Sequence, residues 1–127
     1  NIYAPCAESH DWSIQCNDYE NAILDIGGLD TVLCTIGPDG RIACNMPGGE
    51  LAPVTHVERT DGGRVVTVGI STIMAAKRVI AVLSGYALSK IAPLVITGPV
   101  LPNVPASYLQ LHQNAIFMLD EDAAEHV

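Results

Sequence analysis

Three short apolar runs constrain the fold of this chain more than any other feature of its sequence. They are Thr31–Ile36, Val79–Leu83 and Ala115–Leu119. The first two are continuously apolar or β-branched, which is typical of strands buried in a parallel sheet. A further strand is predicted at Val65–Val68, after the turn signal Asp61-Gly62-Gly63. Because helical patterns separate the strands, the order predicts β-α-β units with right-handed crossovers.

Helices are predicted before, between and after these strands. The first is capped by Ser13, presents polar residues such as Glu20 outward, and ends at Gly27-Gly28, since glycine readily supplies the positive φ of a helix C-terminus. Residues 41–61 are expected to form a loop. The other helices are predicted from Ser71 through Lys77, from about Tyr86 to Gly98 with Pro93 shortening or kinking it, over Ala106–His112 with Pro105 at its start, and over Asp120–His126.

These elements predict an α/β, Rossmann-like three-layer arrangement with a mainly parallel sheet of about four strands. A chain of 127 residues fits one domain, 1–127. Hydrophobic residues make up 49% of it and charged residues 16%. So apolar a balance in so short a chain predicts extensive burial, part of it against another chain or a further segment.

The charge and the cysteines exclude several functional classes. The net charge is −8, from six Lys and Arg against 14 Asp and Glu, and no basic stripe exists, so nucleic acid is not an expected partner. The apolar runs are too short to cross a membrane, and no signal peptide is recognised. No metal site or cofactor is expected. The four cysteines are Cys6, Cys16, Cys34 and Cys44. They show neither a C-x-x-C pair nor the spacing of a zinc site, so free thiols in a reducing cytoplasm are favoured over a disulfide framework.

The loop after the first strand is the expected place for a ligand, because doubly wound folds bind ligands beyond the carboxyl ends of their strands. Pro38-Asp39-Gly40 is also a turn signal, so turn chemistry alone explains the aspartate. Arg41 is either a solvated charge or a ligand for a phosphate or carboxylate. Asn45 bonds either a substrate hydroxyl or its own loop.

The same loop resembles the G-x-G-x-D-G-H-I-A-F-N-E-P motif of the glucosamine-6-phosphate deaminases, with Thr35 in place of the first glycine. Nearly all of the chain is similar to the C-terminal half of that family. The further matching segments, in the same order as in the family, are Gln15–Glu20, Gly28–Asp30, Leu51–Val57, Thr67–Ile70, Pro105–His112 and Asp120–Ala124.

The resemblance implies half of the glucosamine-6-phosphate deaminase/6-phosphogluconolactonase-type fold and a phosphorylated sugar as ligand. It also implies a homodimer or a complementing N-terminal segment. The family's lysine position is held by Leu88, and Lys90 stands two residues further on. The implied site consists of Asp39 as catalytic residue and Gly37, Gly40, Arg41, Asn45 and Lys90 as substrate-binding residues.

Two catalytic positions of the family motif are replaced. In the family the motif's Asp, His and Glu act together at the ring oxygen of the sugar; here Asp39 is kept, while Arg41 and Met46 replace the His and the Glu. Arginine stays protonated near neutrality and cannot shuttle a proton, and methionine cannot polarise a neighbour as a carboxylate does. Three hypotheses follow: an amino sugar phosphate deaminase/isomerase, a non-catalytic sugar-phosphate-binding or regulatory module, and a remnant that only dimerises.

Overall fold

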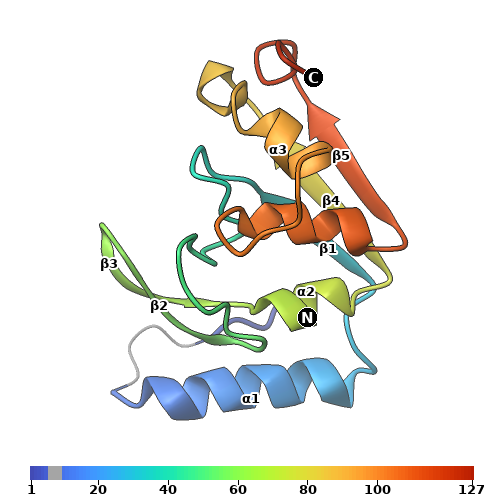
Figure 1. Cartoon of the computed structure of the whole chain (residues 1–127). Helices are drawn as coiled ribbons and strands as arrows, with labels where there is room; N and C mark the ends of the chain where they lie inside the picture. The colour runs from blue at the N-terminus through green and yellow to red at the C-terminus, as the bar shows by residue number, and fades with distance from the viewer. Residues whose placement is uncertain (6–9) are drawn as a thin grey trace.

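A three-stranded parallel sheet forms the centre of the structure (Figure 1). The computed structural model describes residues 1–5 and 10–127, so Cys6 lies outside the described residues. The strands are β1 (Thr31–Thr35), β4 (Arg78–Leu83) and β5 (Ala115–Leu119), in the order β1-β4-β5. The three apolar runs are thus confirmed as strands, and the predicted α/β fold with a mainly parallel sheet is confirmed.

The register of the strands separates the sheet into two faces. Cys34 of β1, Ala81 of β4 and Phe117 of β5 lie in one row, on the face that packs against the helices. Leu33, one residue earlier in β1, is on the opposite face and is 72% exposed. The continuous apolar run of β1 therefore does not produce a strand buried on both faces in this chain.

The first helix, α1, spans Trp12–Asp25. Its N-cap is Asp11, whose carboxylate accepts a hydrogen bond from the Ile14 N–H at 3.2 Å, so the predicted Ser13 cap is wrong. Asp11 has the extended backbone that a cap requires, whereas Ser13 already lies in the first turn. Gly27 and Gly28 end the helix with φ of +86° and +92°, as expected.

Two of the remaining predicted helices are shorter than expected, whereas the one over 106–112 is present at its predicted position as a 3₁₀ helix. The remaining helical segments are α2 (Ile70–Met74), η1 (Tyr86–Leu88), α3 (Ala92–Ile96) and η2 (Pro105–Leu111), where η marks a 3₁₀ helix. The predicted helix over 86–98 is divided, and Pro93 lies in the first turn of α3, where its missing N–H costs nothing. α2 begins after Gly69 rather than at a Ser71 cap. Residues 120–126 form turns, so the predicted terminal helix is also wrong.

A β-hairpin projects beside the sheet (Figure 1). β2 (His56–Thr60) and β3 (Gly63–Thr67) pair antiparallel as a separate two-stranded sheet. The expected loop over 41–61 ends at residue 55, because β2 was not predicted. The strand predicted at Val65–Val68 is present as β3, but its expected place in the parallel sheet is wrong. Two residues connect Thr60 to Gly63, and so short a connection permits only an antiparallel pair, because parallel strands need a crossover of a dozen or more residues.

The core lies between the parallel sheet and α2, α3 and η2. Its fully buried side chains include Ile73 of α2, Val95 of α3 and Leu109 of η2, packed with Val79 and Leu83 of β4. No helix of the described residues is long and apolar enough to cross a membrane.

Candidate functional site

The loop that follows β1, from Gly37 to Met46, starts at the carboxyl edge of the parallel sheet. Its first part is a closed turn: the Gly40 N–H donates to the Gly37 carbonyl at 2.9 Å, and the Gly37 N–H donates to the Arg41 carbonyl at 3.0 Å. Gly40 has φ of +87°, and a Cβ there would lie 2.9 Å from Cγ1 of Val104. Glycine is therefore needed at position 40 both for its backbone conformation and for its close packing.

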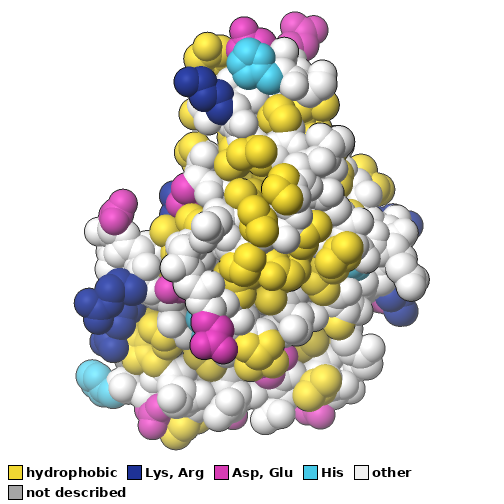
Figure 2. All heavy atoms as spheres, viewed as in Figure 1, with side chains coloured by type: hydrophobic (Ala, Val, Ile, Leu, Met, Phe, Trp, Pro, Cys, Tyr) yellow, Lys and Arg dark blue, Asp and Glu magenta, His cyan; other side chains and the backbone are white. Residues whose placement is uncertain are grey.

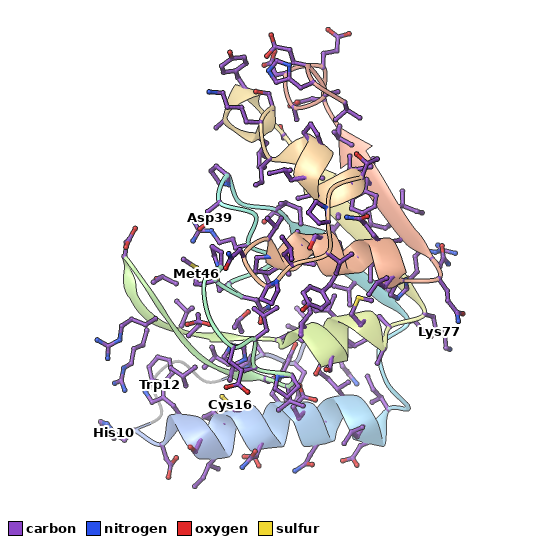
Figure 3. The ribbon with its side chains drawn as sticks, viewed as in Figure 1. His10, Trp12, Cys16, Asp39, Met46 and Lys77 are labelled. Carbon is purple, nitrogen blue, oxygen red and sulfur yellow. The ribbon has the colours of Figure 1, made fainter. Side chains whose placement is uncertain are left out.

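Asp39, Arg41 and Met46 contact one another. Oδ1 of Asp39 lies 3.2 Å from Nε of Arg41 and also accepts the Arg41 backbone N–H at 3.1 Å. The guanidinium Nη1 lies 3.6 Å from the Met46 sulfur. Figure 3 labels Asp39, near the start of the loop, and Met46, at its end, on the same side of the molecule. The two residues that replace the motif's His and Glu thus form one cluster with the retained aspartate, and about one third of the Asp39 and Arg41 side chains is exposed.

Asn45 holds the end of the loop against β3. Its Nδ2 donates to the carbonyls of Ile42 at 3.0 Å and Val68 at 2.8 Å, while its Oδ1 has no partner, and the residue is 1% exposed. Beside it, the Cys44 N–H donates to Oγ1 of Thr67 at 3.2 Å. One donation of Asn45 stays within the loop and the other reaches Val68 just after β3, so this buried side chain fixes the position of the loop.

Lys90 lies on the surface just after η1. Its neighbour Ile91 reaches the loop, because Cδ1 of Ile91 lies 3.5 Å from the position of a Cβ on Gly40. Leu88, which stands where the family motif has its lysine, is buried in the core at 5% exposure. A cation at position 88 would have to leave the core to meet a ligand, whereas Lys90 is already exposed.

The loop alone does not form an enclosed pocket. A hollow of about 330 Å³ opens further along the same connection, but neither Asp39 nor Arg41 lines it. Asp39 and Arg41 also do not line four other hollows found among the described residues. The hollow of about 330 Å³ is lined by Gly49, Glu50, Leu51, Pro53, Ile70, Ser71, Pro102 and Tyr108.

Glu20 of α1 binds Thr55, in the segment between the loop and β2, and Thr72 of α2. One carboxylate oxygen accepts three hydrogen bonds of 2.7 Å, from the N–H and hydroxyl of Thr55 and from the hydroxyl of Thr72. Partial burial opposes ionisation, but these hydrogen bonds together outweigh it and lower the pKa of Glu20. The sequence pattern placed Glu20 among the outward polar residues of its helix, and no local signal revealed its partners.

A second carboxylate, Asp120, joins the carboxyl ends of β4 and β5. It accepts hydrogen bonds from the Ser84 hydroxyl at 2.6 Å and from the N–H groups of Gly85 and Ala123, each at 2.8 Å. The Ser84 hydrogen bond is the main cause that lowers the pKa of Asp120. The turn signal at Ser84-Gly85 was recognisable in the sequence, but its pairing with residue 120 depends on the neighbouring positions of β4 and β5.

His112 and the buried thiols have structural roles. His112 Nδ1 accepts the Asn114 N–H at 2.9 Å, and its Nε2 lies 2.8 Å from the Ala76 carbonyl, so this ring is packed between backbone groups. Burial raises the pKa of the Cys34 thiol to about 11, and Cys16, Cys34 and Cys44 are unpaired. Among residues 1–5 and 10–127, no group of three or more His, Cys, Asp and Glu is arranged to hold a metal ion.

Curated relatives of the chain share one name. A glucosamine-6-phosphate deaminase of Clostridium novyi is 33% identical over 98% of this chain and 58% of its own length. A protein of the same name from Pseudarthrobacter chlorophenolicus is 34% identical over 98% of this chain and 54% of its own length. The chain thus spans little more than half the length of these relatives. No family model matches it.

Solved structures with a similar fold include a protein of the same name. A structure described as a monomeric glucosamine-6-phosphate deaminase matches with a TM-score of 0.92 and 26% identity, over 98% of this chain and 59% of its own. The 6-phosphogluconolactonase of Trypanosoma brucei shares the fold at a TM-score of 0.77, with 20% identity over 96% of this chain. The chain is therefore a relative of the glucosamine-6-phosphate deaminases over nearly its whole length, with the fold of the matching part of those proteins.

Proposed function

We propose that this chain binds a phosphorylated amino sugar and, as it stands, does not deaminate it. The observation that carries the proposal is the ion pair between Arg41 and Asp39, with Met46 on the same guanidinium. A guanidinium that stays protonated cannot pass a proton to or from the ring oxygen of a sugar. Without a histidine and a second carboxylate, the loop lacks the acid/base group that ring opening needs.

The same cluster suits binding. Arginine presents five N–H donors in a fork that fits two phosphate oxygens, and only part of this fork is occupied by Asp39 and the Met46 sulfur. The second carboxylate oxygen of Asp39 is an acceptor for a sugar hydroxyl, and Asn45, which is buried, keeps the loop in shape for it. Lys90, which precedes the Ile91 that contacts the turn, is a second exposed cation in a chain whose net charge is −8.

An active deaminase is the second candidate, favoured by the shared name of the curated relatives. Ammonia release from glucosamine 6-phosphate, measured beside calorimetric binding, separates the two. We expect saturable binding without ammonia. Steady ammonia release from the unaltered chain would contradict the proposal. If neither binding nor release is detected, only the hypothesis of a structural remnant is left.

The variant Arg41→His with Met46→Glu refines this test, because it restores both motif residues on the same loop. Ammonia release gained by the double variant would identify the two substitutions as the cause of inactivity. Binding without release in the double variant would assign the inactivity to parts of the fold outside this loop.

We further propose that a complementing segment, rather than a second copy, completes this fold in the cytoplasm. The solved neighbour described as monomeric has a chain of which the match covers only 59%, so the rest of one chain is available there to complete the fold. Two copies of this chain would also bring together two net charges of −8. The unpaired thiols fit a reducing compartment.

A further inference from the structure

One face of the parallel sheet carries apolar side chains that nothing in the described chain covers. Leu33, Met118 and Ile116 are 72%, 54% and 43% exposed, and Ile80 and Val82 between them are half-buried. The register places Leu33, Ile80 and Ile116 in one row, and Val82 and Met118 in the next. The five side chains, from three adjacent strands, are called the bare face below.

A bare apolar face is unusual for parallel strands. Sheets of this kind are normally covered by helices on both faces, since both faces are apolar. Here α2, α3 and η2 all contribute to the core on the opposite face. Figure 2 shows the molecule from the side on which these helices lie, where exposed apolar side chains also gather over α3 and η2.

The surface area of the chain supports the same conclusion. The accessible surface is 7614 Å², whereas a folded monomer of this mass is expected to expose about 6,500 Å². The excess of about 1,100 Å² exceeds the ~800 Å² that each partner buries in a standard interface. A partner that covered the bare face would remove part of this excess.

We propose that the bare face is the docking surface for a polypeptide segment equivalent to the part of the deaminase relatives that this chain does not match. The chain covers 58% of the Clostridium novyi relative, which leaves 42% of that protein to supply such a segment. The inference rests on the proposed completion of the fold and is independent of sugar binding.

The chemistry of the face defines what this segment must present. An amphipathic helix with an apolar stripe fits the two rows of side chains, and its polar side would form the new surface. Arg78 shares the face at the amino end of β4, beside Thr31 of β1. An acidic residue at that end of the helix would pair with it, which fixes the direction in which the helix lies.

The test mixes the purified chain with the unmatched segments of the Clostridium novyi and Pseudarthrobacter chlorophenolicus deaminases, and measures association by sedimentation velocity and calorimetry. The test variant carries Leu33→Thr and Met118→Thr, since threonine keeps the strand propensity while removing apolar surface. The matched control is Leu111→Thr at the end of η2, where the leucine is 65% exposed on the helical side.

We expect a one-to-one complex with at least one segment, weakened about tenfold or more by the face variant and unchanged by the control. A dye that binds exposed apolar surface should also be displaced from the wild-type chain by the segment, a readout that needs no variant. The proposal is overturned by failure of both segments to bind, by a complex that the face variant leaves intact, or by a dimer of the chain alone that this variant dissociates. Failure of sugar binding changes none of these results.

Discussion

The parallel sheet and the segment 37–69 that carries the candidate site are held by different forces. In the sheet, Val79, Ala81 and Leu83 are fully buried against the helices. In segment 37–69, Ile42 is buried in the core, and the other main fixed points are the hydrogen bonds of Asn45 and those that Thr55 donates to Glu20. The stability that apolar burial gives the sheet does not depend on pH, whereas the hydrogen bonds of segment 37–69 can be lost one at a time. The site segment should therefore respond to changes that leave the sheet intact.

The largest effect is expected from a truncation in the sheet. Leu83→Ala removes a side chain with 0% exposure and should lower the free energy of unfolding by ~3 kcal/mol, through lost burial and the cavity that remains. Urea denaturation measures this change. Leu33→Ala on the bare face is the control and should cost less than ~1 kcal/mol. Equal costs at the two positions would contradict the description of the two faces.

A smaller and more local effect is expected for Asn45→Ala. The substitution leaves the carbonyls of Ile42 and Val68 without their side-chain donor, at a cost of ~1–3 kcal/mol. Hydrogen exchange should become faster at the amides of residues 42–46 and stay unchanged in β4. Asn17→Ala, on the exposed side of α1, is the control. Uniformly faster exchange in both regions would break the distinction between sheet and site segment.

Glu20 should make the stability of segment 37–69 depend on pH. Its pKa is lowered in the folded state, so the stability it contributes is present above its unfolded pKa of about 4.3 and is lost as the pH falls through the lower folded pKa. Glu20→Gln should cost ~1 kcal/mol at pH 7, and the gap from wild type should close in acid. Urea unfolding from pH 7 to pH 3 measures it, with Glu121→Gln as exposed control. A gap that is the same at both pH values would contradict the assigned hydrogen bonds.

The smallest change in stability is expected at Arg41. The ion pair with Asp39 is partly exposed, so Arg41→Gln should alter the free energy of unfolding by less than ~1 kcal/mol. The same substitution should weaken glucosamine 6-phosphate binding about tenfold, because it removes the cation of the loop. Arg59→Gln on the hairpin is the control for net charge. Equal losses of affinity in the two variants would indicate a diffuse charge effect instead of a site.

The predictable parts of the fold are those set by local patterns. The apolar runs predicted all three parallel strands, and Gly27-Gly28 predicted the end of α1. β2 was missed because residues 41–61 are rich in turn signals and His56–Thr60 is mostly polar. The exposure of Leu33 could not be predicted either, since an apolar strand reveals that a face needs cover and not which chain supplies it.

The position of the candidate loop after β1 was predictable, and the contacts within it were not. The motif pointed to the loop after β1 and to Asp39, Arg41 and Met46 within it. Their mutual contact depends on how the guanidinium folds back over the turn, which neither spacing nor composition specifies. The partners of Glu20 lie 35 and 52 residues further along the chain, so only the folded arrangement of α1, the connection and α2 reveals them.

Amide chemical shifts recorded during a titration with glucosamine 6-phosphate test the proposed site most directly. The predicted result is a saturable change centred on Gly37, Gly40 and Arg41, next to the exposed guanidinium, with β4 unaffected. Changes confined to other parts of the chain, or a spectrum that stays constant at millimolar sugar phosphate, would contradict it.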